Sequence, residues 1–180
     1  MAEQVVALLR GINVGRNKRV AMADLRRLLI ELGYTEPRTL LNSGNAVFGC
    51  PAGQVAGAAA AIEAAIADRL GVRCAVLTRT GKQLATVLRN NPLAGVATEP
   101  ARYLVGFLSR PMDEAAVSEL LSQDFGPDQL RIAGSEAYLW CPSGIADSPL
   151  PKLAWSKFGV DVTTRNWNTV VKLAELAGQG

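Results

Sequence analysis

A glycine-containing, strongly basic segment near the N-terminus is the part of this sequence best suited to bind an anion. It runs from Arg10 to Arg19, RGINVGRNKR, between an apolar run and an amphipathic stretch. Residues 10–27 hold six basic residues against one acid, a local charge of +5, whereas the whole chain carries +3. Glycines let backbone N–H groups face a ligand, and a helix N-terminus favours negative charge. The segment therefore predicts a site for a phosphate-bearing ligand.

Two further polar segments carry amide, hydroxyl and guanidinium groups that such a site could use. They are residues 42–45, NSGN, and residues 163–169, TTRNWNT. Each also has a purely structural interpretation, as a hairpin turn and as a helix cap respectively. The ligand-binding residues that we expect from the three segments are Arg10, Asn13, Lys18, Arg19, Ser43, Asn45, Arg165 and Asn168.

Several common chemistries are excluded by composition or spacing. The chain has no histidine, so catalytic triads, Cys-His pairs and histidine metal ligands are ruled out. Cys50, Cys74 and Cys141 form no CxxC pair, which argues against a zinc site or a disulfide framework. Neither the dinucleotide-binding GxGxxG spacing nor the phosphate-binding GK[ST] motif occurs. We expect no metal and no cofactor.

Three classes of function stay open on these residues. The first is a binding protein for an anionic small molecule or nucleic acid at the basic segment. The second is a small-molecule enzyme that works by positioning and electrostatics from Arg and Asn, which a perturbed thiol or carboxylate beside Arg10 would favour. The third is a structural or assembly protein without a ligand. Aromatic residues make up only 6% of the chain, which counts against RNA binding through exposed strand aromatics.

The first half of the chain has the pattern of a ferredoxin-like unit. Apolar runs and helical periodicity predict a strand over 4–9, a helix over 22–32, hairpin strands over 38–41 and 46–48, a helix over 55–70 and a strand over 72–78. This β-α-β-β-α-β order places two helices on one face of an antiparallel sheet. The fold class is therefore α+β.

The sequence predicts the same order of elements again after a short connection. Thr80-x-x-Gln83 matches a capping box for a short helix ending near residue 91, and residues 93–100 resemble a linker. The following pattern predicts a strand over 103–108, a helix over 113–121, hairpin strands over 130–133 and 137–141, a short helix over 152–158, a short strand over 160–163 and a helix over 167–177. We therefore expect a duplicated architecture: a first unit over 1–80, a helix and linker over 81–100, and a second unit over 101–180.

The composition fits an ordinary globular protein of the cytoplasm. The chain has 180 residues, of which 49% are apolar and 19% charged, enough to build a sizeable core. No apolar run approaches the roughly 20 residues of a membrane helix, and the N-terminus does not resemble a signal peptide. We expect a cytoplasmic location and no membrane partner. The oligomeric state stays open.

Three motifs together resemble one uncharacterised bacterial family, the domain-of-unknown-function family 1697. They are residues 7–15, ALLRGINVG, residues 42–45, NSGN, and residues 164–170, TRNWNTV. The resemblance extends over nearly the whole chain and implies a bacterial protein of two ferredoxin-like units, with no assigned reaction. Relatives often carry Ser-Lys-Leu where this chain has SPLPKL over 148–153, so no role for a lysine is carried over there. Relatives commonly have proline at the position of Ala21.

Overall fold

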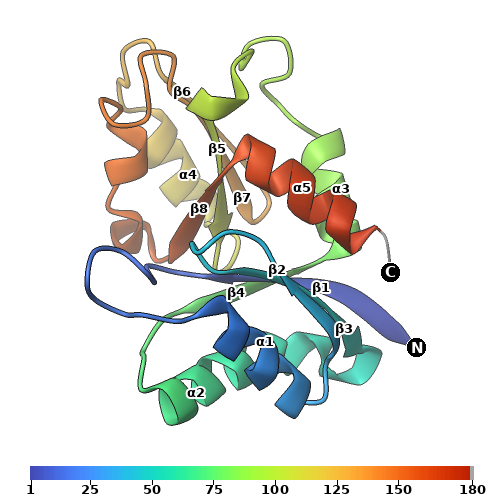
Figure 1. Ribbon diagram of the computed structural model, residues 1–180. Coiled ribbons are helices and arrows are strands. Elements are labelled where there is room, and N and C mark those ends of the chain that lie inside the picture. The colour runs from blue at the N-terminus through green and yellow to red at the C-terminus, as the bar shows by residue number, and fades with distance from the viewer. Residues whose placement is uncertain (179–180) are drawn as a thin grey trace. The chain divides into compact units, whose positions relative to one another are not determined.

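The computed structural model describes residues 1–178 and contains two four-stranded antiparallel sheets (Figure 1). The first sheet is built from β1 (Ala2–Leu9), β2 (Thr35–Thr39), β3 (Asn45–Pro51) and β4 (Val76–Thr80). Its strand order is β2-β3-β1-β4, and every neighbouring pair is antiparallel. The expected pairing of the first and last strands of this unit is therefore confirmed.

Two α-helices cover one face of the first sheet. They are α1 (Met22–Glu31) and α2 (Ala58–Leu70), and a 3-10 helix over Ala52–Gly57 leads into α2. Both lie on the same side of the strands (Figure 1). The alternation of β1 turns Val5, Ala7 and Leu9 towards these helices, and all three are fully buried.

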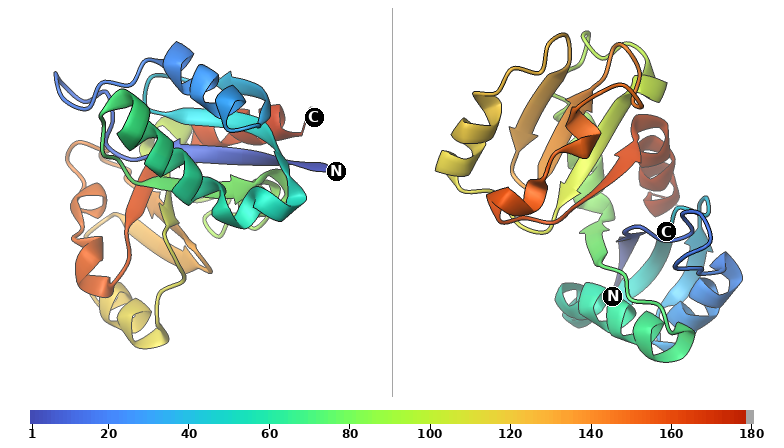
Figure 2. Two further views of the ribbon diagram at one scale, coloured as in Figure 1. Left: turned by 90° about the horizontal axis from the view of Figure 1, so that it is seen from below. Right: turned by 90° about the vertical axis from the view of Figure 1, so that its left-hand side faces the viewer.

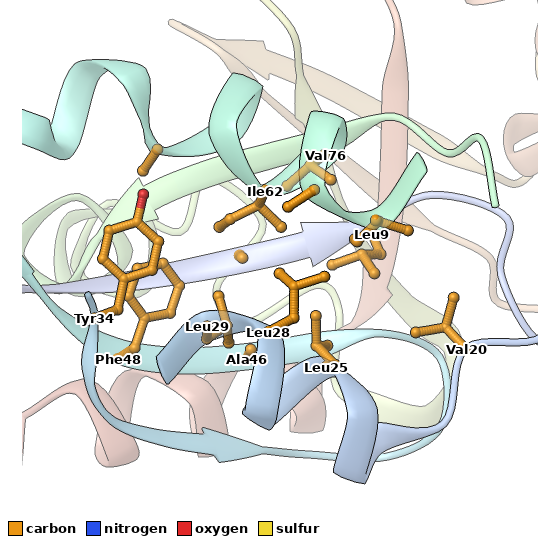
Figure 3. Close-up of a cluster of buried hydrophobic side chains, with 14 of the residues drawn as sticks. Leu9, Val20, Leu25, Leu28, Leu29, Tyr34, Ala46, Phe48, Ile62 and Val76 are labelled. Atoms are coloured by element: carbon orange, nitrogen blue, oxygen red, sulfur yellow. The ribbon is translucent and has the colours of Figure 1, made fainter. Parts of the chain in front are cut away.

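The core of the first unit is filled from both helices and three strands, as Figure 3 shows. Leu25, Leu28 and Leu29 of α1 recur at helical spacing and meet the sheet, which explains why this segment is a helix with one apolar face. The rings of Tyr34 and Phe48 stack with centroids 4.6 Å apart.

The second sheet has an equivalent strand order but a different cover. It consists of β5 (Tyr103–Leu108), β6 (Gln129–Ala133), β7 (Glu136–Trp140) and β8 (Val162–Asn166), in the order β6-β7-β5-β8. One α-helix, α4 (Glu114–Leu121), and two 3-10 segments, η3 (Leu150–Lys152) and η4 (Trp155–Phe158), pack on one of its faces (Figure 2). Both sheets together confirm the α+β fold of two ferredoxin-like units.

Two more helices complete the description. The helix α3 (Gly81–Arg89) begins with the predicted capping box: Gln83 N–H donates to Thr80 Oγ1 at 3.2 Å, and Thr80 N–H donates to Gln83 Oε1 at 2.8 Å. The last helix, α5, spans Trp167–Ala177 as expected. Contacts divide the chain into two compact units, residues 1–86 with the described residues from Lys172 onward, and residues 87–171.

Several predicted elements differ from the observed ones. The helix expected over 152–158 is replaced by η3 and η4, because Leu153 takes an extended backbone conformation between them (φ −59°, ψ 138°) and Gly159 ends the second segment at φ +74°. The last strand of the second unit lies over Val162–Asn166 rather than 160–163. In the first unit β4 starts at Val76, not 72, so residues 72–75 form irregular chain.

The edge strand β2 is also displaced from its predicted position. It begins at Thr35 rather than residue 38, and its register with β3 shifts between Thr35 and Arg38. Pro37 lies in this interval and lacks an N–H group, and Glu36 takes a positive φ of 47°.

Among the described residues, no helix is long and apolar enough to cross a bilayer.

Candidate functional site

The basic loop over 10–21 connects β1 to α1 and folds back on itself. Asn13 N–H donates to Lys18 O at 2.9 Å, and Asn17 N–H donates to Val14 O at 3.4 Å, so residues 14–17 form the tip. Asn13 and Lys18 take positive φ values of 54° and 50°, a region that Asn tolerates better than most residues. Lys18 and Arg19 are exposed beyond this narrow turn.

The Asn13 side chain holds the base of the loop. Its Oδ1 accepts from Val20 N–H at 2.8 Å, and its Nδ2 donates to Val20 O at 2.8 Å and to Asn42 O at 2.7 Å. Ile12 and Val20 beside it are buried and anchor the loop to the core. The Asn13 amide is thus engaged in shaping the loop, and the ligand-binding role expected for it stays a prediction.

The turn over 42–45 lies directly against this loop. Gly44 O accepts from Leu9 N–H at 2.8 Å, and a Cβ placed on Gly44 would lie 2.7 Å from Leu9 Cβ. Only glycine fits this close approach, and its φ of +90° reinforces the requirement. Two of the three polar segments predicted from sequence therefore lie side by side.

Within this turn, Asn45 and Ser43 differ in their exposure. Asn45 is completely buried, and its Nδ2 donates to Leu40 O at 2.7 Å and to Ser43 Oγ at 3.0 Å. Ser43 is exposed beside it. The Asn45 amide accordingly closes the turn between β2 and β3, as the hairpin interpretation expects, and its contact with a ligand stays a prediction.

A hollow of about 460 Å³ lies beside the basic loop, where β1 ends. Its walls are Arg10, Gly11, Lys18, Glu63, Arg73, Cys74 and Ala75. The wall carries three cationic side chains against one carboxylate. Arg10 N–H donates to Ala75 O at 2.9 Å, which fixes the loop beside the irregular segment 72–75. The hollow thus combines chain segments more than 60 residues apart.

The Glu63 carboxylate and the Cys74 thiol line the hollow together with the cationic side chains. Glu63 Oε2 accepts from Val76 N–H at 3.1 Å, so the carboxylate is turned towards the start of β4. Burial raises the pKa of the Cys74 thiol, and Glu63 raises this pKa further, while Lys18 lowers it in part. A thiol with a raised pKa is protonated at neutral pH and is a poor nucleophile. The hollow is consequently lined by three cationic side chains and a protonated thiol rather than an activated thiolate.

Arg73 is not among the ligand-binding residues that the sequence predicts. The apolar run over 72–78 predicts a buried strand, whereas the structure has irregular chain before Val76 and an exposed Arg73. A signal was present, because Gly71 ends α2 in a left-handed conformation and an arginine follows two residues later. Arg19, which we did expect in the site, does not line the hollow.

The third polar segment belongs to the other compact unit. Arg165 on β8 is 7% exposed, and its Nη1 donates to Thr163 Oγ1 and Thr164 O, both at 2.8 Å. Burial lowers the pKa of Arg165 to about 10. Asn168 is exposed at the start of α5, and its N–H donates to Asn166 Oδ1 at 3.0 Å, so Asn166 caps the helix. The expected convergence of Arg165 and Asn168 with the basic loop stays a prediction.

The aromatic ring in this third segment stacks within its own unit. Trp167 is half-buried, and its ring lies 4.9 Å from that of Tyr103 at an interplanar angle of 23°. Tyr103 in turn meets Trp140 edge-on at 6.5 Å and donates from its hydroxyl to Asn91 Oδ1 at 2.6 Å. Trp167 thus has the packing role that its position in the apolar stripe predicts.

The described residues contain no group of three or more His, Cys, Asp or Glu side chains placed to hold a metal ion. The cysteines at 50, 74 and 141 are all buried and free.

Comparisons with known proteins agree with this architecture and assign no activity. A search of curated proteins finds no match. Among solved structures, the conserved bacterial protein SP0830 from Streptococcus pneumoniae is similar, with a TM-score of 0.76 at 21% identity, over 98% of this chain and 99% of that chain. A likeness at this identity establishes the fold alone. A family model described as "Protein of unknown function (DUF1697)" matches residues 2–138, and the chain belongs to this family.

Proposed function

We propose that this protein binds a phosphate-bearing anion, a nucleotide or a nucleic-acid strand, in the hollow lined by Arg10, Lys18 and Arg73. The observation that carries the proposal is the gathering of three cationic side chains from two chain segments, the basic loop and residues 72–75, around one hollow of about 460 Å³. A volume of this order is typical of small-molecule sites, roughly 300–1,000 Å³. Charge-assisted hydrogen bonds from Lys and Arg are the strong contacts that phosphates make.

The rigidity of the loop supports the same proposal. Asn13 ties the loop to Val20 and to the neighbouring turn at Asn42, so the backbone around Lys18 is held before any ligand arrives. A preformed site loses less conformational entropy on binding than a mobile loop does. Binding, rather than nucleophilic catalysis, is also what a Cys74 thiol with a raised pKa favours.

The test is a titration with ATP and with a single-stranded oligothymidylate at several salt concentrations. We expect Arg73→Ala to weaken binding about tenfold, since a lost hydrogen bond to a charged group costs roughly 1.5–3 kcal/mol. Arg19→Ala is the matched control: it also removes one arginine charge, from the basic loop, but Arg19 lies outside the hollow. Its effect should stay below about twofold.

The salt dependence separates the two kinds of ligand. A single strand neutralised by three cations should give a slope of log K against log salt near −2, taking about −0.7 per contact. Binding of ATP and the oligonucleotide that is unchanged by Arg73→Ala would contradict the proposal. Equal losses for Arg73→Ala and Arg19→Ala would also contradict it, because they would indicate a diffuse surface charge in place of a defined hollow.

A further inference from the structure

In the second unit, the edge strand β6 and the C-terminal end of α4 border a hollow, which we call the β6 hollow. Its volume is about 490 Å³, and all of its walls come from residues 121–131. β6 is an outermost strand of its sheet, and α4 lies beside it at this margin (Figure 2). A hollow between a helix and an open sheet edge suits an extended peptide that adds one strand to the sheet.

The backbone N–H and C=O groups of Leu130 and Ile132 point outward from this edge. Successive residues of a strand direct their backbone groups to opposite sides. Leu108 N–H donates to Ser135 O at 2.8 Å, so the odd-numbered residues of β7 bond to β5 and the even-numbered ones to β6. These even-numbered residues pair with the odd-numbered residues of β6. Leu130 and Ile132 therefore present their main chain to an incoming strand.

The two edge strands of the first sheet are less accessible to such pairing. In β2 the register is interrupted near Pro37, which has no N–H group. In β4, Val76 N–H donates to Glu63 Oε2 at 3.1 Å and Thr80 N–H to Gln83 Oε1 at 2.8 Å, so side chains already use these outward donors. β6 instead keeps an unbroken register with β7 over its whole length. It therefore offers a regular edge that β2 and β4 do not.

Arg131 occupies part of the β6 edge. Its Nη1 donates to Leu130 O at 2.9 Å, and its Nη2 donates to Gln129 Oε1 at 3.5 Å. Leu130 O is one of the outward acceptors that an added strand would use. The exposed Arg131 side chain thus competes with an incoming N–H group for this carbonyl.

The charge around the β6 hollow indicates which peptides it favours. Residues 111–130 contain five acidic residues and no basic residue, a local charge of −5. Two of these acids line the hollow: Asp124 is exposed, and Asp128 is buried with its carboxylate accepting from Ser148 Oγ. Arg131 is the cation in the same wall. The surroundings are therefore negative in sum, which attracts a basic segment.

The apolar part of the wall fits the stem of a long cationic side chain. Leu121, at the end of α4, is 42% exposed, and Phe125 is half-buried in the following loop. Lys and Arg lay their aliphatic stems along apolar surface and keep the charged group in water. A wall that combines these two side chains with the Asp124 carboxylate suits both parts of such a residue.

We propose that the β6 edge binds an extended basic segment of a partner protein, which adds to the second sheet as a further strand. The main chain of the segment bonds to Leu130 and Ile132. Its Lys or Arg side chains, at alternate positions, lay their stems on Leu121 and direct their charge to Asp124. This interaction goes beyond the proposed phosphate site, because the two hollows share no residue and attract opposite charges.

The probe is the synthetic peptide acetyl-TKVKVKT-amide, whose lysines lie on one face when it is extended. Its titration into the isotope-labelled full chain is followed by NMR. We expect saturable shifts of the Leu130 and Ile132 amides with a Kd below about 1 mM, and at least about tenfold weaker binding of acetyl-TEVEVET-amide. Absence of saturable shifts at about 1 mM, or equal affinity of the two peptides, would overturn the proposal.

Two N-methylated forms of the lysine peptide test strand addition itself. Methyl groups on the lysine nitrogens and on the valine nitrogens block opposite edges of the extended peptide, because its N–H groups alternate in direction. One form should lose binding, and the other should stay within about threefold of the parent peptide. Equal effects of the two modifications would overturn the addition of a strand at β6.

Variants of the protein locate the binding. Asp124→Asn should weaken binding of the lysine peptide about twofold to fivefold, and it keeps an oxygen for the Gly126 N–H hydrogen bond of 2.8 Å, so the loop is retained. Asp147→Asn removes the same charge from an exposed position outside the hollow and should leave the affinity unchanged. Arg131→Ala should strengthen binding about twofold or more, because it frees Leu130 O and removes a like charge. Equal affinities of the two aspartate variants, or weaker binding by Arg131→Ala, would overturn the site.

A second copy of this chain is the alternative occupant of the β6 edge. Sedimentation of the protein alone at about 100 μM should show no association, and the Leu130 and Ile132 amides should exchange rapidly until the lysine peptide is added. A dimer in which these two amides are already protected from exchange would make the second copy the occupant and would overturn the proposed peptide.

Discussion

The two sheets of this protein have equivalent strand orders, yet the connection that follows the first strand differs greatly between them. In the first unit β1 is joined to α1 by the twelve residues 10–21, which include the basic loop. In the second unit β5 is joined to α4 by the five residues 109–113. A shared topology therefore carries a long polar loop in one unit and a short connection in the other.

The basic residue of the short connection is used by the protein itself. Arg110 donates from Nε and Nη2 to Gly159 O at 3.0 and 2.7 Å. In the long connection, Arg10 and Lys18 line a hollow together with Arg73. The comparison shows that strand pairing fixes the fold in both units, while the length of one loop decides which unit offers a cationic surface.

The hairpins of the two units give the largest expected contrast. Gly44→Ala should lower the free energy of unfolding by about 3 kcal/mol, because the new Cβ meets Leu9 Cβ at 2.7 Å and φ is +90°. Gly134→Ala in the second hairpin should cost only about 1 kcal/mol, since its φ is +59° and the nearest atom, Glu136 Oε2, is 3.9 Å away. Urea denaturation measures both. Equal losses would show that the turn at 42–45 is not packed against the loop as described.

Asn13 tests whether the long loop is held as rigidly as the short one. Asn13→Ala removes one acceptor and two donor contacts, and we expect a loss of about 2–3 kcal/mol in the free energy of unfolding. Asn17→Ala at the exposed tip should change it by less than about 0.5 kcal/mol. Similar small effects of both variants would contradict a structural role for the Asn13 amide.

The helices α3 and α4 differ in whether a side chain caps their first turn. Thr80→Ala removes the acceptor of the Gln83 N–H hydrogen bond and should cost about 1 kcal/mol. Asp113→Ala should lower the free energy of unfolding by only a few tenths of a kcal/mol. The reason is that, within the described residues, the Asp113 side chain makes no capping hydrogen bond. Thermal unfolding of the two variants provides the comparison, and an equal loss would show that Asp113 caps α4 in solution.

The smallest effect at neutral pH is expected at Tyr138 in the second unit. Its hydroxyl donates to Val87 O at 3.3 Å, a long hydrogen bond, so Tyr138→Phe should cost less than about 1 kcal/mol at pH 8. Burial raises the pKa of Tyr138 to about 12, and Glu136 contributes to the rise. Between pH 10 and about 12 the unfolded chain therefore releases a proton that the folded chain retains.

The sign of the pH dependence follows from this difference. Because the folded state binds more protons in this window, the free energy of unfolding of the wild type falls with rising pH relative to Tyr138→Phe. The difference between the two proteins should shrink above about pH 10 and then reverse, which urea denaturation at a series of pH values measures. A difference that is independent of pH would mean that the Tyr138 pKa is close to 10.

Much of the fold was predictable because it depends on interactions between near neighbours in sequence. The apolar stripe over 167–177 and the apolar run over 103–108 predicted the observed bounds of α5 and β5. Thr80 and Gln83 form the expected capping box. The helix over 152–158 was predicted less well. Its composition suits a helix, but the backbone is extended at Leu153 and only two 3-10 segments form.

The candidate site was likewise predictable from the sequence only in part. The sequence by itself determined that charge is concentrated at residues 10–27 and that a glycine-containing turn lies at 42–45, since residue types and local spacing are sufficient for both statements. Only the tertiary structure decided that Arg73 joins Arg10 and Lys18 while Arg19 does not, and that Asn13 and Asn45 use their amides on the backbone. The physical reason for the make-up of the hollow is that it depends on antiparallel pairing of β1 with strands more than 30 residues away. Local sequence patterns contain no information on which distant side chains such pairing brings together.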